Sequence, residues 1–476
     1  MYLCMVIENS SVFPVIKKSF SISASLALPL VLASSISAQG IKVSSKTIVN
    51  SLNTTKETTV PNRQLISQTT IPVTYYVSGT GSDSNNGLSS SSAFRTIQRA
   101  ANLTNPGDTV MIMNGLYTSQ DYGKVVSITR SGTSGAWIKY QAYPGHKPKI
   151  KHQSWHGILI TNGAAYIEIN GLEVEGNNAN ITLDYAKSQQ YTANNPLTSG
   201  NCISIEGRNT KPPHHIRILN NKIHDCGSAG IGSWQADYLT IVGNEVYNNA
   251  WYSVYAASGI SLYQNRNYDT NTGYKMFVTH NKVYNNRQYI PWIVNGRIVD
   301  GNGIIIDDAR NTQNGSTLGI YQGRTLIANN ISYQNGGSGI LSYSSDHVDI
   351  INNTLYFNCL SPEITKSQLS ADESSDVKVF NNIVYSTLNK KVNGAWLSTD
   401  ITYKNNMYFN SSIIDPVVSS DIVANPQFVN ASTGDFRLQS TSPAINKGVQ
   451  FMNDDFLKNP RPSGTSSDIG AYEYQF

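Results

Sequence analysis

The stretch Val348-Asp-Ile-Ile-Asn-Asn-Thr-Leu-Tyr356 decides the fold, because the chain repeats this unit many times. Each copy alternates apolar residues, turns at an Asn and continues into a second short apolar segment. The other copies are Ile216–His224, Leu239–Tyr247, Phe277–Tyr284, Leu326–Tyr333, Val377–Tyr385 and Ile401–Phe409. The recurrent asparagines lie 23, 37, 49, 23, 29 and 24 residues apart, at Asn221, Asn244, Asn281, Asn330, Asn353, Asn382 and Asn406. A basic period near 23 residues with insertions of varied length predicts a β-solenoid, because insertions leave the stacked strands unchanged.

A further strand follows in each unit and begins with Gly-Ile or a close variant. Its copies begin at Gly157-Ile158, Cys202-Ile203, Gly230-Ile231, Gly259-Ile260, Gly303-Ile304 and Gly339-Ile340. Three short strands per coil predict an all-β fold, a right-handed parallel β-helix with three sheets and inward-pointing Ile, Val and Leu. The recurrent Asn is expected to stack on its counterparts in a ladder that satisfies the turn backbone.

An amphipathic helix is predicted before the repeats. Residues Ala93 to Leu103 place apolar side chains at helical spacing, and Asn105-Pro106-Gly107-Asp108 ends the segment. We expect this helix to cap the first coil, whose strand edge would otherwise be open.

Composition excludes two classes of function. Charged residues make up 14% of the 476 residues, and 35 Lys and Arg against 31 Asp and Glu give a net charge of +4. This balance argues against a nucleic-acid partner, which requires a concentrated basic face. It also argues against a disordered chain, which combines few hydrophobic residues with a high net charge.

The amino-terminal segment is typical of a secretory signal. Lys17 and Lys18 precede an apolar run from Phe20 to Ala33, and small residues continue to Ala38. We therefore predict a secreted or cell-surface protein, without a transmembrane segment in the mature chain. The predicted parts are a signal peptide (1–38), a flexible linker (39–71), the β-helix domain (72–430) and a C-terminal cap or tail (431–476).

The cysteines do not form a recognisable framework. Cleavage of the signal would remove Cys4 and leave Cys202, Cys226 and Cys359, without the spacing of a zinc site. A bridge between Cys202 and Cys226 is one option that the sequence leaves open.

Several short motifs carry a family resemblance. They are Tyr75-Tyr-Val-Ser-Gly-Thr-Gly-Ser-Asp83, Phe94-Arg-Thr-Ile-Gln-Arg-Ala100, Pro106-Gly-Asp-Thr-Val110, Gly115-Leu-Tyr117 and Tyr166-Ile-Glu-Ile-Asn-Gly-Leu-Glu-Val174. This part of the chain resembles family-nine polysaccharide lyases and related secreted right-handed β-helix proteins. The carboxyl end, with Asp435-Phe-Arg-Leu438 and Asp468-Ile-Gly-Ala-Tyr-Glu-Tyr474, resembles the tail common on exported β-helix proteins. In the lyase family, Asp residues from neighbouring coils bind calcium and a Lys acts as base.

Alternation along the Gly-Ile strands predicts one outward column of side chains. The column is Glu206, Trp234, Tyr263, Asp307 and Tyr343. Aromatic rings stack on sugar rings and carboxylates bind hydroxyls or calcium, so this stripe is predicted to bind a polysaccharide. The alternative is that the aromatic side chains merely cover a solvated sheet.

The densest acidic cluster in the repeats surrounds the strand that begins at Gly303. Asp300, Asp307 and Asp308 are predicted to hold calcium, which prefers several hard oxygen ligands. Arg310 or Arg297 is the available basic partner, Arg310 in catalysis and Arg297 in substrate binding. The longest insertions border the same strands, at 248–258, 264–273, 286–302 and 309–322.

Three functions remain open from the sequence. The leading one is a monomeric, calcium-assisted lyase that cleaves a uronate-containing polysaccharide by β-elimination. A glycoside hydrolase would instead divide the acid and base roles between Asp307 and Asp308, or between Asp300 and Asp307. The third is a non-catalytic glycan-binding protein of the surface or matrix. For the acidic residues themselves the structural alternative is that Asp300 caps a turn and Asp308 forms a salt bridge with Arg310.

Overall fold

The computed structural model describes residues 71–411 and 417–476. The predicted signal peptide and all but the last residue of the predicted linker lie outside the described residues. None of the helices in the described part is long and apolar enough to cross a bilayer.

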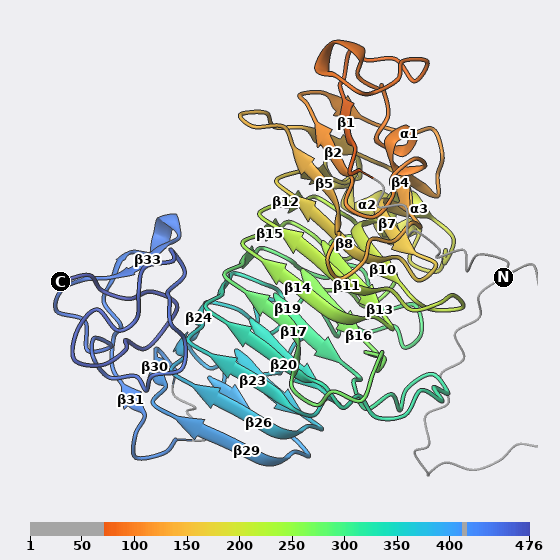
Figure 1. Ribbon diagram of the computed structural model, residues 1–476. Helices are drawn as coiled ribbons and strands as arrows, with labels where there is room; N and C mark the ends of the chain where they lie inside the picture. The colour runs from red at the N-terminus through yellow and green to blue at the C-terminus, as the bar shows by residue number, and fades with distance from the viewer. Residues whose placement is uncertain (1–70, 412–416) are drawn as a thin grey trace, which may run out of the picture. The chain divides into compact units, whose positions relative to one another are not determined.

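Three parallel sheets stack along the described chain (Figure 1). Sheet 1 contains, in sequence and spatial order, β1 (Thr74–Val77), β2 (Thr109–Ile112), β5 (Ile138–Ala142), β8 (Ala165–Asn170), β11 (His214–Leu219), β14 (Asp237–Val242), β17 (Tyr274–Thr279), β20 (Arg324–Ala328), β23 (Val348–Ile351), β26 (Ser375–Phe380) and β29 (Thr399–Lys404). Sheet 2 contains β3 (Leu116–Tyr117), β6 (Lys149–Lys151), β9 (Glu173–Glu175), β12 (Lys222–His224), β15 (Glu245–Tyr247), β18 (Lys282–Tyr284), β21 (Ile331–Tyr333), β24 (Thr354–Tyr356), β27 (Ile383–Tyr385), β30 (Met407–Phe409) and β31 (Ile422–Val423). Sheet 3 contains β4 (Lys124–Ile128), β7 (His156–Thr161), β10 (Asn201–Glu206), β13 (Ile231–Trp234), β16 (Ile260–Tyr263), β19 (Ile304–Asp307), β22 (Ile340–Tyr343), β25 (Leu369–Asp372) and β28 (Asn393–Gly394).

From β2 to β28 the chain visits sheets 1, 2 and 3 in turn, so each of these coils contributes one strand to each sheet. The predicted all-β, right-handed parallel β-helix is therefore confirmed. In five central strands of sheet 3, from β10 to β22, one Ile pairs in register with its counterpart one coil away and is fully buried: Ile203, Ile231, Ile260, Ile304 and Ile340. These stacked aliphatic side chains form the core inside the coils.

The predicted asparagine ladder is present at the turn between sheets 1 and 2. Each side-chain amide donates to the side-chain oxygen of its counterpart in the next coil at 3.0–3.1 Å, through Asn221, Asn244, Asn281, Asn330, Asn353, Asn382 and Asn406. Each amide also donates to a strand carbonyl, as Asn330 does to Val278 at 2.8 Å. Because all seven are at most 2% exposed, the ladder satisfies turn groups that water does not reach.

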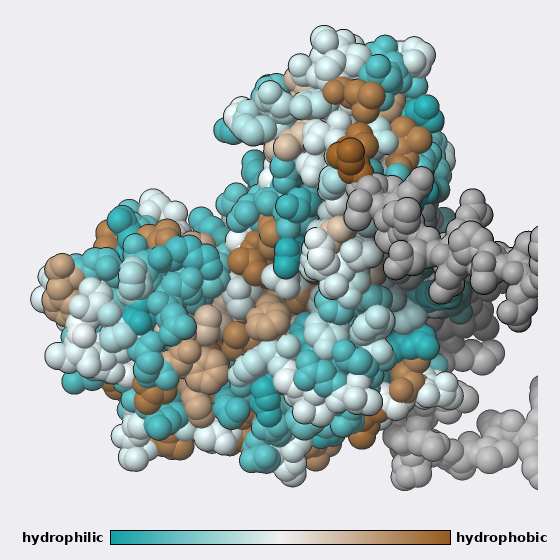
Figure 2. All heavy atoms as spheres, in the orientation of Figure 1, coloured by the Kyte–Doolittle hydropathy of each residue, from teal (hydrophilic) through white to brown (hydrophobic). Residues whose placement is uncertain are grey.

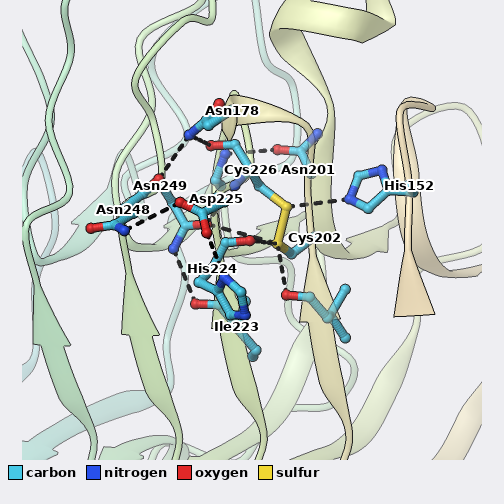
Figure 3. The surroundings of a disulfide bond; sticks show 12 residues. His152, Asn178, Asn201, Cys202, Ile223, His224, Asp225, Cys226, Asn248 and Asn249 are labelled. Carbon is cyan, nitrogen blue, oxygen red and sulfur yellow. Dashed lines mark hydrogen bonds and ion pairs between the residues drawn. A yellow bond between two sulfur atoms is a disulfide. The ribbon is translucent and has the colours of Figure 1, made fainter. Parts of the chain in front are cut away.

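A second asparagine ladder, which the sequence analysis missed, occupies the turn between sheets 2 and 3. Asn249, Asn286, Asn335 and Asn358 are linked by side-chain hydrogen bonds of 2.9–3.1 Å. One coil earlier the backbone N–H of Cys226 donates to Asn249 at 3.0 Å, so a cysteine takes the ladder position there (Figure 3). Cys226 forms a disulfide with Cys202 in β10, which resolves the option that the sequence left open.

The capping helix is shorter than predicted. Helix α1 covers Ile97–Ala101 and buries Ile97, Ala100 and Ala101 against β1, β2 and β4 of the first coil. The residues before it are extended because Phe94 donates to the carbonyl of Tyr76 at 2.8 Å. Two further short helices, α2 (Leu183–Ser188) and α3 (Pro196–Ser199), lie in the connection between β9 and β10.

The C-terminal tail, residues 431–476 with β33 (Asp435–Leu438), packs along the turn between sheets 1 and 2. The strand β33 pairs antiparallel with β32 (Phe428–Asn430). In each of five successive coils, the residue directly before the ladder Asn forms a hydrogen bond with the tail at 2.7–3.2 Å: His280, Asn329, Asn352, Asn381 and Asn405. Apolar side chains of sheet 1 meet Met452 of the tail, and Figure 2 shows apolar side chains gathered in this area.

Two of the long insertions are fixed by a buried ion pair between residues at the starts of β14 and β17 in sheet 1. The ammonium of Lys275 lies 2.5 Å from a carboxylate oxygen of Asp237, and both side chains are almost fully buried. Asp237 also accepts the backbone N–H of Tyr268 and the hydroxyl of Tyr321 at 2.7 and 2.6 Å. The insertions 264–273 and 309–322 are thus held by the same carboxylate.

The first ladder predicts a large effect for one amide. Asn330→Ala removes the acceptor of two hydrogen bonds from Asn281 and the donor to Asn353, all of them buried. We expect the free energy of unfolding to fall by about 3 kcal/mol, because buried polar groups lose their partners. Chemical denaturation measures this change, with the exposed Asn430→Ala as the control. Equal, small losses in both variants would contradict a stabilising ladder.

Candidate functional site

The outer side chains at the ends of the sheet 3 strands form one column. The strand pairing places Glu206 opposite Trp234, Trp234 opposite Tyr263, Tyr263 opposite Asp307, and Asp307 opposite Tyr343. The predicted order of the column is therefore confirmed, while its role stays a prediction. The pairing continues from Tyr343 to Asp372 of β25, which the sequence analysis did not include.

The amino-terminal end of the column is occupied by an arginine. Arg208 donates to both carboxylate oxygens of Glu206 at 2.7–3.3 Å. Its guanidinium carbon also lies 4.9 Å from the ring centroid of Trp234. Glu206 and Trp234 thus share a cation, and a sugar would have to compete with Arg208 for that face of the indole ring.

Asp308 does not face outward. Its side chain is fully buried and accepts from Gln264 at 2.8 Å and from the backbone N–H groups of Thr312 and Gln313 at 2.9 Å. Both carboxylate oxygens are engaged in folding the insertion 309–322. The structure therefore does not bring Asp308 to a position where it contacts substrate or metal.

The two predicted basic partners are also placed elsewhere. Arg310 forms a bidentate pair with Asp346 at 2.7–3.0 Å and not with Asp308. The backbone is left-handed at Asp308, two residues before Arg310, so the two side chains are not directed toward each other. A guanidinium held by a carboxylate remains protonated and does not serve as a base. Arg297 is exposed on the insertion 286–302, where its backbone N–H donates to Asn295 at 3.1 Å.

Asp300 and Asp307 lie in surroundings that favour their neutral forms. Burial raises the pKa of Asp300 from its usual 3.8 to about 6, against the opposing influence of Lys366 and Asn302. Burial also raises the pKa of Asp307 well above its usual value, and the charges of Asp300 and Asp308 add to the effect. A carboxyl group that holds its proton near neutral pH is suited to act as a general acid.

A lysine completes this cluster, although the sequence analysis missed it. The ammonium of Lys366 lies 3.8 Å from a carboxylate oxygen of Asp372 and 4.8 Å from the ring centroid of Tyr343. Its positive charge also lowers the pKa of both Asp300 and Asp307. We call Asp300, Asp307, Tyr343, Lys366 and Asp372 the acidic cluster.

The acidic cluster is built from three coils and two connections. Asp307, Tyr343 and Asp372 end β19, β22 and β25, whereas Asp300 and Lys366 come from the segments before β19 and β25. The strand β25 starts at Leu369 without the Gly-Ile signature, so the repeat pattern gave no reason to continue the column. The spacing was the available signal: Asp372 follows Gln368 by four residues, just as each other column residue follows the Gly or Cys of its motif by four.

The predicted calcium ligands do not form one convergent set. Within the described residues, two groups of three His, Cys, Asp or Glu side chains place their ligand atoms within 4.8 Å of one another. Neither group contains Asp300, Asp307 or Asp308. One contains the disulfide cysteines, and in the other Glu173 and Glu175 are paired with Lys149. Calcium therefore stays a prediction from the sequence, and we derive no chemical step through it.

The three stacked parallel sheets and the strand-end column define a right-handed parallel β-helix protein with a candidate site on sheet 3. Residues 75–370 match the family model described as the Pel9A-like, right-handed beta helix region. The chain belongs to this family, as the resemblance of its motifs predicted.

Individual relatives are distant in sequence. The crystal structure of pectate lyase Pel9A is 17% identical with a TM-score of 0.52, and the match covers 85% of this chain and 97% of that one. A structure titled rhamnogalacturonan lyase is 14% identical with a TM-score of 0.39, covering 78% and 95% of the two chains. The uncharacterized protein YwoF of Bacillus subtilis (strain 168) is 24% identical over 78% of this chain and 91% of its own length.

The raised pKa of Asp300 predicts a stability change that depends on pH. Since the folded state disfavours the charged form, this group's contribution to stability is complete below pH 3.8 and is lost as the pH rises through about 6. Asp300→Asn removes that loss. We expect it to raise the free energy of unfolding by up to about 3 kcal/mol at pH 8, for a shift of about two pKa units, and to leave it unchanged at pH 4.

Denaturation curves at the two pH values measure the difference. Asp346→Asn is the matched control, because it breaks the pair with Arg310 and should destabilise the protein at pH 8. A loss of stability for Asp300→Asn at pH 8 would show that the charged carboxylate is needed for folding.

Proposed function

We propose that the protein is a carbohydrate-active enzyme that cleaves a polysaccharide at the acidic cluster. The observation that carries the proposal is the position of Asp307, whose pKa is raised by burial, in the same cluster as Lys366 and Asp372. A buried acid next to an amine supplies the proton donor and the second polar group that cleavage between sugars requires. Membership in the Pel9A-like family supports the same class of substrate.

The leading reaction is β-elimination on a uronate-containing glycan. Lys366 is the proposed base and takes the proton from the carbon next to the sugar carboxylate. The electron pair of that C–H bond forms the new carbon–carbon double bond while the bond to the leaving sugar oxygen breaks. Asp307 gives its proton to that oxygen. Lys366 thus fills the role of the base that the family resemblance implied and for which Arg310 is unsuited.

Glycoside hydrolysis is the second candidate, because two carboxyl groups flank Tyr343 in the column. Asp307 and Asp372 lie on either side of Tyr343 in the column. Their backbones are thus two strand spacings apart, about 10 Å. Carboxyl groups in inverting hydrolases are separated by ~6.5–9.5 Å. Asp307 would protonate the glycosidic oxygen and Asp372 would activate water.

Calcium, secretion and the monomeric state remain predictions from the sequence. The buried Cys202–Cys226 disulfide supports an oxidising compartment, since such bonds persist outside the cytosol.

The reaction type is tested on polygalacturonate, alginate, galactan and xylan, each with calcium and with a chelator. An unsaturated product, detected by its ultraviolet absorbance, supports the lyase. New reducing ends without that absorbance support the hydrolase. No cleavage of any polymer would overturn the proposal of an enzyme and favour a glycan-binding protein. Loss of activity with chelator would show that a cation assists the reaction.

Two variants assign the roles within the acidic cluster. We expect Asp307→Asn to lower kcat by about 100-fold or more, because a general acid typically contributes that much. Lys366→Arg keeps the positive charge but not the base, so a lyase should lose kcat with little change in KM. The measurement is steady-state kinetics on the polymer that is cleaved.

The exposed Asp400→Asn and Lys391→Arg are matched controls and should leave both constants unchanged. Full activity of Lys366→Arg would exclude the lysine as base and leave it a binding role. Full activity of Asp307→Asn would contradict the general acid in either mechanism.

A further inference from the structure

A hollow apart from the acidic cluster lies near the amino-terminal end of sheet 3. It is a hollow of about 530 Å³, and the residues that line it include Tyr122, Trp155, Asn194, Pro196 and Leu197. This volume is within the range of sites that hold small ligands. None of its lining residues belongs to the acidic cluster.

The backbone around the hollow is held by sheet hydrogen bonds. Trp155 donates to the carbonyl of Tyr122 at 2.8 Å and accepts from Asn201 at the same distance. The two aromatic residues thus lie just before the paired strands β4 and β7, and Asn201 begins β10. The rings are presented by a rigid edge and not by a free loop.

The opposite wall is the start of helix α3. Asn195 caps this helix by accepting the backbone N–H of Leu197 at 3.1 Å, and its amide donates to Gln189 at 3.1 Å. Asn195 is 7% exposed, so these bonds fix the turn that carries Asn194 and Pro196. Asn194 is exposed and its side chain makes no hydrogen bond to any residue between 71 and 411 or 417 and 476. Its amide is available to a ligand.

The chemistry of the lining suits an uncharged ring with hydroxyl groups. The lining contains an indole, a phenol ring that is 58% exposed, a proline, a leucine and two amides, and no charged residue. Aromatic faces cover the apolar C–H face of a sugar, while amides bond to hydroxyls. The neighbouring hollow beside α1 differs, because Arg95, Asp121 and Lys124 line it and the last two form an ion pair at 2.8 Å.

The hollow lies along the same edge of sheet 3 as two members of the acidic cluster. Its residues precede β4, β7 and β10, just as Asp300 and Lys366 precede β19 and β25. From β10 to β19 the sheet advances by three strands, about 14 Å. A glycan chain lying along the stacked coils would therefore reach both places.

We propose that the hollow of Tyr122, Trp155 and Asn194 binds a neutral hexose unit of the glycan whose cleavage we assign to the acidic cluster. The inference rests on that proposed function for the identity of the polymer. The hollow contributes affinity at a distance from the bond that is broken, and the acidic cluster contributes the chemistry. Long substrates therefore gain from it and short ones do not.

Binding is tested first, by calorimetry with cellohexaose, mannohexaose and β-1,4-galactohexaose on the full chain carrying Asp307→Asn. We expect at least one neutral hexamer to bind and Trp155→Ala to weaken it about tenfold. Trp155→Phe should retain most of the affinity, since the aromatic face remains. The control is Trp396→Ala, which removes a tryptophan that is 60% exposed and lies outside the hollow.

Kinetics on the protein with an intact acidic cluster give the second test. Trp155→Ala should raise KM for the polymer about tenfold, leave kcat unchanged and leave cleavage of short oligosaccharides unaffected. Binding that depends on Trp155 without any cleavage would refute the proposed function and retain the hollow as a sugar site. If the polymer is cleaved but neither hexamer binding nor KM changes in Trp155→Ala, the sugar site in the hollow is refuted and the proposed function stands. Binding of oligogalacturonate but of no neutral hexamer would overturn the assignment of an uncharged ligand.

Discussion

The hydrogen bond between stacked asparagine amides is the constraint on which the rest of the structure depends. Asn244 accepts from Asn221 and donates to Asn281, and the same exchange repeats along the turn at nearly constant length. Each amide also donates to a backbone carbonyl, so a shift of one coil by one residue would strand several buried polar groups. The ladder therefore fixes the register of the strands, and the register fixes which side chains share the strand-end column.

Much of the fold was predictable because it follows from this repetition. The Asn spacing predicted the coils, the Gly-Ile starts predicted sheet 3, and alternation predicted the neighbours of Tyr263. The second ladder was missed because Cys226 replaces its first amide and the residues before it vary. The capping helix was predicted to start too early, at Ala93. The apolar residues there have helical spacing, but Phe94 pairs with Val77 as a strand residue, which the sequence does not reveal.

The acidic cluster was predicted only in part, since it combines repeated and non-repeated segments. Asp307 and Tyr343 occupy repeat positions and were found. Lys366 comes from a connection of no regular pattern, and its proximity to Asp372 follows from folding and not from spacing. Asp308 was predicted to belong to the site and does not. It is adjacent to Asp307 in sequence, but a left-handed backbone conformation turns its side chain inward, where it stabilises the insertion 309–322. Adjacent charges in a solenoid thus need not share a surface.

The tail changes how the coils depend on one another. In a simple solenoid each coil contacts only its neighbours, so unfolding can spread from an end one coil at a time. Here a single segment bonds in parallel to five successive coils, from His280 to Asn405. Opening the last coil therefore does not free the one before it, which is still held by the tail. We therefore expect the carboxyl-terminal half to unfold as one cooperative block, with the residues beside the ladder opposing fraying from that end.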